Sequence, residues 1–151
     1  MNTKMFKGVG AAISLIVGMG AASPVLATST GRQTLGTPTG ATDVFTFNCG
    51  FSSNAAANVA DLDPPFNVPP RMRVMLVKGG AAAQREDDTP PTTGGEDGAA
   101  SGNAVLPGIG NFSVLFFKTA PGVEAYEGNV VCNGLPPAFP FNPVLNRTQN
   151  Q

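Results

Sequence analysis

The densest group of chemically active side chains is a set of five carboxylates in one polar segment, residues 81–101 (AAAQREDDTPPTTGGEDGAAS). Calcium binds about six to eight oxygen atoms, and acidic loops that contain glycine supply such ligands. The segment lacks the D-x-D-x-D spacing of a calcium hand, so a solvated acidic loop is the simpler interpretation. Its composition predicts a long, mobile loop between two strands. The candidate calcium ligands are Glu86, Asp87, Asp88, Glu96 and Asp97.

Two further carboxylates, Asp61 and Asp63 in ADLDPP, form a second candidate calcium site. Asp63 directly precedes a proline, and an aspartate in that position commonly forms a turn. Both interpretations stay open at this point.

Nucleophilic catalysis has little support, because the chain contains no histidine. Ser–His and Cys–His pairs are therefore impossible, and so are zinc sites built on histidine. A pair of carboxylates could act as in glycosidases. The dense carboxylates lie in the segment expected to be mobile, where fixed geometry is hard to hold. We therefore expect a protein that is not an enzyme.

The two cysteines lie in strand-like stretches near opposite ends of the expected domain, in TDVFTFNCG and YEGNVVCNG. Redox-active pairs are usually close in sequence, as in C-x-x-C, whereas these two are far apart. Cysteines of exported proteins usually form structural disulfides. We predict a bond between Cys49 and Cys132, with their two strands side by side or face to face.

The first 27 residues have the layout of a secretory signal peptide. Lys4 and Lys7 precede an uncharged apolar run over residues 8–22, and small residues precede a predicted cleavage after Ala27. The run is shorter than the roughly 20 residues that cross a bilayer, so no stable membrane anchor is expected after cleavage. The sequence therefore predicts a secreted or periplasmic protein.

Charge and composition restrict the class of partner. The net charge is −1 and becomes more negative once Lys4 and Lys7 are removed with the signal. Nucleic acid is not an expected partner, because no run of basic residues is present to neutralise phosphates. The chain has no tryptophan and one tyrosine, so a glycan-binding platform of aromatic rings has little support. A protein or polysaccharide partner is expected.

Nineteen glycines and fourteen prolines interrupt the chain too often for long helices. Short alternating or apolar runs predict strands instead. We expect an all-β fold, a small antiparallel β-sandwich or jelly roll over residues 43–134. Residues 28–42 are expected to be a flexible lead-in, and residues 135–151 an extended or disordered tail rich in proline. The strands are expected at residues 44–49, 55–62, 71–78, 111–118 and 126–132, with a short one near residue 105.

The tail carries two unusual aromatic residues, Phe139 and Phe141 in PPAFPFNP. They could dock a partner if exposed, or cover a sheet edge if folded back.

The order of TDVFTFNC, RMRVMLVKGG, GIGNFSVLFFK and YEGNVV resembles the bacterial pre-peptidase C-terminal domain family over residues 42–133. The resemblance implies a small jelly-roll sandwich whose first and last strands are adjacent. Members of that family usually follow a catalytic domain, and their central strand is rich in aspartate where this chain has Arg71 and Arg73. A calcium site therefore does not carry over directly. A non-enzymatic binding or structural role is expected, with a pilus- or adhesin-like subunit or a calcium-dependent accessory module as alternatives.

Overall fold

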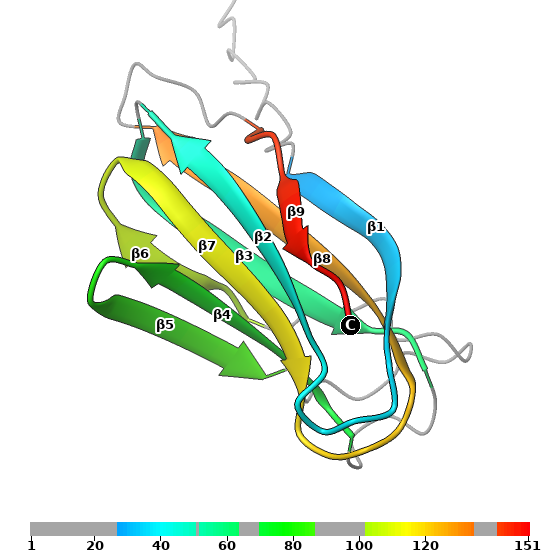
Figure 1. The fold of residues 1–151 in the computed structure, drawn as a ribbon. Helices are drawn as coiled ribbons and strands as arrows, with labels where there is room; N and C mark the ends of the chain where they lie inside the picture. The colour runs from blue at the N-terminus through cyan, green and yellow to red at the C-terminus, as the bar shows by residue number, and fades with distance from the viewer. Residues whose placement is uncertain (1–26, 51, 64–69, 87–101, 135–141) are drawn as a thin grey trace, which may run out of the picture.

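The computed structural model describes residues 27–50, 52–63, 70–86, 102–134 and 142–151 (Figure 1). These residues form β-strands in two antiparallel sheets and contain no helix. The predicted all-β sandwich is therefore confirmed. The strands are β1 (Thr28–Leu35), β2 (Thr42–Cys49), β3 (Ser52–Asp61), β4 (Met72–Lys78), β5 (Ala81–Glu86), β6 (Ala104–Pro107), β7 (Gly110–Lys118), β8 (Glu124–Gly134) and β9 (Asn146–Gln149).

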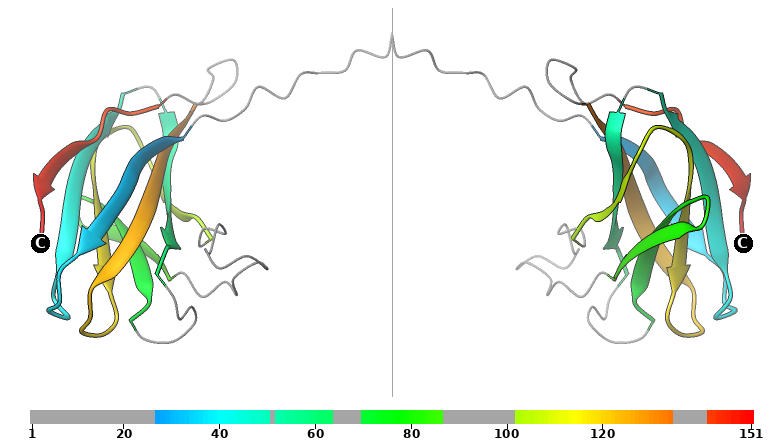
Figure 2. Two further views of the ribbon diagram at one scale, coloured as in Figure 1. Left: turned by 90° about the vertical axis from the view of Figure 1, so that its right-hand side faces the viewer. Right: turned by 90° about the vertical axis from the view of Figure 1, so that its left-hand side faces the viewer.

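The strand order is that of a jelly roll with one added strand. One sheet has the order β1-β8-β3-β6 and the other β5-β4-β7-β2-β9. The first strand pairs with the eighth, the second with the seventh, the third with the sixth and the fourth with the fifth. This is a long hairpin folded over on itself, which is the eight-stranded jelly roll. Strand β9 extends the second sheet at the free edge of β2, and Figure 2 shows the two layers from the side.

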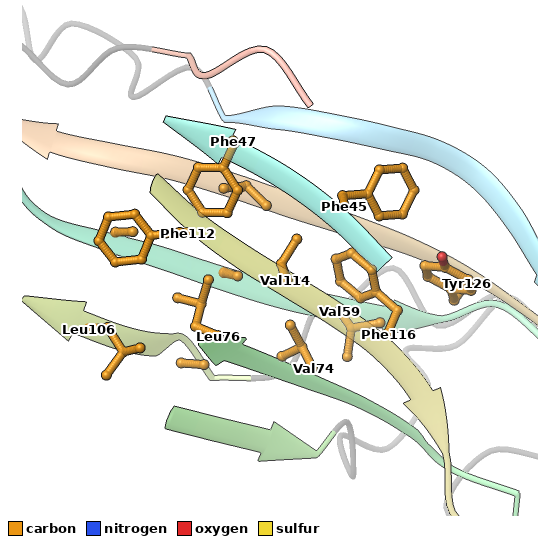
Figure 3. Packing of buried hydrophobic residues seen from close by; sticks show 14 of the residues in the cluster. Phe45, Phe47, Val59, Val74, Leu76, Leu106, Phe112, Val114, Phe116 and Tyr126 are labelled. Atoms are coloured by element: carbon orange, nitrogen blue, oxygen red, sulfur yellow. The ribbon is translucent and has the colours of Figure 1, made fainter. Parts of the chain in front are cut away.

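The core lies between the sheets and follows from the alternation of side chains along each strand. The five-stranded sheet contributes large inward side chains, whereas β3 contributes mainly alanines. Aromatic rings make the central contacts (Figure 3): Phe47 stacks on Phe112 at 5.5 Å between ring centroids, and Phe116 stacks on Tyr126 at 5.1 Å. The predicted strand at residues 55–62 is thus present, and its small side chains face the large ones.

The predicted disulfide is present and joins the two sheets. Cys49 ends β2 in one sheet and Cys132 lies on β8 in the other, with 5.5 Å between their Cα atoms. Both residues are fully buried. The two strands lie face to face across the core, which is one of the two arrangements that the sequence predicted.

Three segments expected to lack regular structure contain strands, which corrects the sequence-based boundaries. Residues 28–35 of the supposed lead-in form β1 against β8, and residues 146–149 of the supposed tail form β9 against β2. Both strands lie at sheet edges and are held by backbone hydrogen bonds to one neighbouring strand. Leu35 is the one buried side chain in these two strands. Their sequences therefore lack the alternation by which half-buried strands are identified.

The third correction concerns the acidic segment 81–101. Its first six residues form β5, which pairs with β4 through a tight turn at Gly79 and Gly80. Gly79 has a φ of 56°, a conformation that glycine adopts without cost and that two-residue hairpin turns require. The Gly-Gly pair therefore indicates a hairpin turn between two strands, and not only the end of one strand. Residues 87–101 lie outside the described residues.

We expect Gly128→Ala to destabilise the fold by about 1–3 kcal/mol through overpacking. A Cβ atom on Gly128 would lie 2.2 Å from the Phe116 ring, which packs directly on the β8 backbone. The matched control is Gly40→Ala, because a Cβ atom there meets no atom within 4 Å. Urea denaturation of both variants measures the difference, and equal midpoints would contradict this account of the core.

Replacing both cysteines with alanine should lower the free energy of unfolding by about 4 kcal/mol, since the bond joins residues 83 positions apart. The double variant avoids leaving one reactive thiol. Its thermal midpoint is to be compared with that of the wild type in the absence of reductant. An unchanged midpoint would mean that the two sheets hold together without the bond.

Candidate functional site

A hollow of the described surface lies on the outward face of the five-stranded sheet. It is a groove of about 740 Å³ whose floor is formed by β2 and β7, which lie side by side (Figure 1). Because Phe47 and Phe112 point into the core, their neighbours along each strand point outward. Thr46 lies opposite Ser113 in the strand pairing, so the floor displays hydroxyl groups.

A pair of amides continues the floor. Asn48 lies opposite Asn111, and the Nδ2 atom of Asn48 donates a hydrogen bond of 2.6 Å to the Oδ1 atom of Asn111. Both side chains are exposed. Each amide keeps further donor and acceptor capacity for a ligand.

Two segments from different parts of the chain form the walls. One wall is the end of β4 with Val77, Lys78 and Gly79, and the other is the strap, which we define as residues 142–146 ahead of and into β9. Lys78 carries the only charge among the described residues that line the groove. Its Nζ atom lies 5.3 Å from the centroid of the Phe112 ring, a cation–π distance. Lys78 has the inward parity of Leu76, so its ammonium group lies on the core side of the sheet. The outward side chains of the floor are therefore amides and hydroxyls.

The chain that directly follows the strap is held by a buried carboxylate. Asp43 on β2 is fully buried, and its Oδ2 atom accepts hydrogen bonds from the Tyr126 hydroxyl at 2.7 Å and from Nη2 of Arg147 at 2.6 Å. Its Oδ1 atom accepts from the backbone N–H of Gln151 at 3.1 Å. Burial, and then the hydrogen bond to Asp43, raise the pKa of Tyr126 well above its ordinary value. One carboxylate therefore connects β2, β8 and residues 147–151, which directly follow the strap.

Of the five predicted calcium ligands in the acidic segment, Glu86 lies among the described residues. Glu86 on β5 forms ion pairs with Arg71, at 3.1 Å, and with Arg73. Burial alone would raise the pKa of Glu86, but hydrogen bonds from the two arginines outweigh burial and lower it. The other four candidates, Asp87, Asp88, Glu96 and Asp97, lie outside the described residues.

Asp61 and Asp63 form hydrogen bonds and an ion pair at one end of the sandwich. Asp63 accepts a hydrogen bond of 2.7 Å from the backbone N–H of Ala125 and pairs with Arg32 at 3.4 Å, while its own N–H donates to Asp61 at 3.2 Å. These contacts match the turn-forming interpretation. Within the described ranges, no three His, Cys, Asp or Glu side chains are grouped to hold a metal ion.

A buried carboxyl pair accompanies this turn and was not anticipated. Glu124 and Asp61 are both buried, as is Lys118, whose Nζ atom donates to the backbone carbonyls of Gly36 and Gly122. Burial first, and then the charge and hydrogen bond of Asp61, raise the pKa of Glu124 to about 8. Sequence reasoning missed the pair because Asp61 and Glu124 lie on strands far apart in the chain.

Two other predictions lie outside the described residues. Phe139 and Phe141, the proposed docking residues, fall in residues 135–141. The predicted signal peptide, residues 1–27, lies outside the described residues except for Ala27. The described residues contain no helix that could cross a membrane.

We expect Arg147→Ala to cost about 2 kcal/mol of stability, because Asp43 would stay buried with one charge-assisted hydrogen bond fewer. The control is Arg32→Ala, which removes a pair whose side chains are 57% and 34% exposed and should cost less than about 1 kcal/mol. Denaturant unfolding of both variants is the measurement. Equal losses would mean that Asp43 and Arg147 contribute no more than a surface pair.

Stability should fall as pH rises from about 5 to about 8. The folded protein retains a proton on Glu124 that the unfolded chain releases, since the pKa rises from 4.5 to about 8 on folding. The slope can reach about 1.4 kcal/mol per pH unit. Glu124→Gln should reduce this dependence of the free energy of unfolding on pH. The control is Glu127→Gln, because Glu127 lies on the same strand and accepts an exposed hydrogen bond from Ser29. This control should keep the dependence of the wild type. Parallel curves for wild type and Glu124→Gln would refute this assignment.

Comparison with known proteins does not extend this picture. No protein-family model, curated protein or solved structure matches the chain. The resemblance to the pre-peptidase C-terminal domains therefore stays a prediction.

Proposed function

We propose that the chain is an exported, non-enzymatic binding protein and that the groove on the five-stranded sheet is its binding site. The observation that carries the proposal is the lining, whose outward side chains on the floor are amides and hydroxyls, at a volume of about 740 Å³, within the range typical of ligand sites. Among the described lining residues there is no carboxylate, cysteine or histidine. Such a lining can bind a ligand through hydrogen bonds.

Export is supported by two independent features. The disulfide between Cys49 and Cys132 fits an oxidising compartment. The first strand begins at Thr28, directly after the predicted cleavage position at Ala27. We therefore place the working protein in the periplasm or outside the cell.

The alternative roles have less support. A subunit that donates its N-terminal strand to a neighbour needs that strand free, whereas β1 pairs with β8 of its own chain. A calcium-dependent accessory module, as the resemblance suggests, would need other ligands than Glu86, which is engaged by two arginines.

The groove can be tested by filling it. Asn111→Trp places a large ring in the groove at an exposed strand position that tolerates aromatic residues. The immobilised protein should retain material from a cell-envelope preparation, and the variant should lose at least about nine-tenths of that retention at an unchanged thermal midpoint. The control is Val105→Trp, an exposed position on β6 in the other sheet. Equal retention by all three proteins would place binding elsewhere and overturn the proposal.

A further inference from the structure

We propose that the groove takes a neutral saccharide, a chain of uncharged sugar rings. This inference rests on the proposed binding function of the groove and names its ligand class.

No charged side chain of the described lining faces the floor. The one charged residue of that lining, Lys78, has its Nζ atom 5.3 Å from the centroid of the inward Phe112 ring. The same atom lies beside Gly108, where an added Cβ atom would meet it at 2.6 Å, so the ammonium group is on the core side of the sheet. The outward charge of β4, on Arg73, forms an ion pair with Glu86, and both residues lie outside the lining. A charged ligand on the floor would lose hydration without gaining a counter-charge, which favours an uncharged one.

The amide pair of the floor presents an acceptor and a donor side by side. Since the Nδ2 atom of Asn48 donates to the Oδ1 atom of Asn111, Oδ1 of Asn48 and Nδ2 of Asn111 keep capacity for a ligand. The hydroxyls of Thr46 and Ser113, which lie opposite each other two residues further along the strands, both donate and accept. Neighbouring hydroxyl groups of a sugar ring also donate and accept, and they match this arrangement.

Aliphatic side chains offer contacts to the C–H faces of sugar rings. Val77 lies in the wall formed by β4, and Val144 in the strap is 77% exposed. Beyond the hydroxyl pair, Val44 lies opposite Leu115, and both have the outward parity of the floor residues. The phenyl rings of the lining point into the core, so these aliphatic contacts take the place of stacking on an aromatic ring.

A peptide has no free strand edge to pair with at the floor. Strand β2 is paired with β7 on one side and with β9 on the other, and β7 is paired with β4 on its far side. An extended peptide therefore cannot add to the sheet there through its backbone. Recognition has to use side chains, which favours a ligand that carries hydrogen-bonding groups along its whole periphery, as a saccharide does.

The test is isothermal titration of the purified protein with defined hexamers. The neutral probes are hexamers of glucose, mannose, galactose and N-acetylglucosamine. The comparison probes are a hexamer of uronic acids and a hexapeptide of alternating serine and asparagine. We expect binding of at least one neutral saccharide and of neither comparison probe. The affinity should be the same at about 50 mM and about 500 mM sodium chloride, because no ion pair contributes to it.

Asn111→Ala should weaken binding of the neutral saccharide at least about fivefold, the loss that one hydrogen bond implies. The matched control is Asn103→Ala. Asn103 accepts a hydrogen bond of 3.0 Å from Nδ2 of Asn58, so it belongs to an exposed amide pair of the other sheet. This control should leave the affinity unchanged.

Tighter binding of the uronic acid hexamer, or an affinity that falls with salt, would overturn the neutral class. Equal binding of the hexapeptide would overturn the saccharide. Equal effects of the two alanine variants would place the saccharide outside the groove. If no hexasaccharide binds while envelope material is still retained in a manner sensitive to Asn111→Trp, this inference fails and the proposed function stands.

Discussion

Strands β2 and β8 are joined across the core at two points, and the rest of the structure depends on this double connection. Near one end the Tyr126 hydroxyl donates to buried Asp43, and six residues further along each strand the disulfide joins Cys132 to Cys49. Six residues of strand span roughly 20 Å. The two sheets are therefore held in one alignment over most of the length of these strands.

This alignment explains the distribution of large and small residues. With β2 and β8 fixed face to face, the phenyl rings of the five-stranded sheet project toward a sheet whose β3 strand contributes mainly alanines. Phe116 occupies the space that Gly128 leaves open. A domain of this size needs close packing of such layers. The alanines of β3 and the glycine of β8 are therefore as necessary to the core as the rings themselves.

The buried carboxylate of Asp43 also connects the core to the outward face of the five-stranded sheet. Asp43 holds Arg147, Arg147 fixes β9, and the residues just before β9 form a wall of the groove. Shape at the proposed site is thus set by a buried hydrogen-bond network rather than by the lining alone. A substitution of Asp43 would therefore alter the shape of the groove, although Asp43 does not line it.

The sequence by itself determined which side chains share a face and which cysteines pair. Alternation in TDVFTFNC separates buried Phe45 and Phe47 from outward Thr46 and Asn48, and this property needs no knowledge of neighbouring strands. The edge strands β1 and β9 escaped prediction because their stability comes from backbone pairing with distant partners. The groove could not be predicted from the sequence for the same reason. Asn48, Asn111 and the strap lie far apart in the chain, and only the order of strands in the folded sheet brings them together.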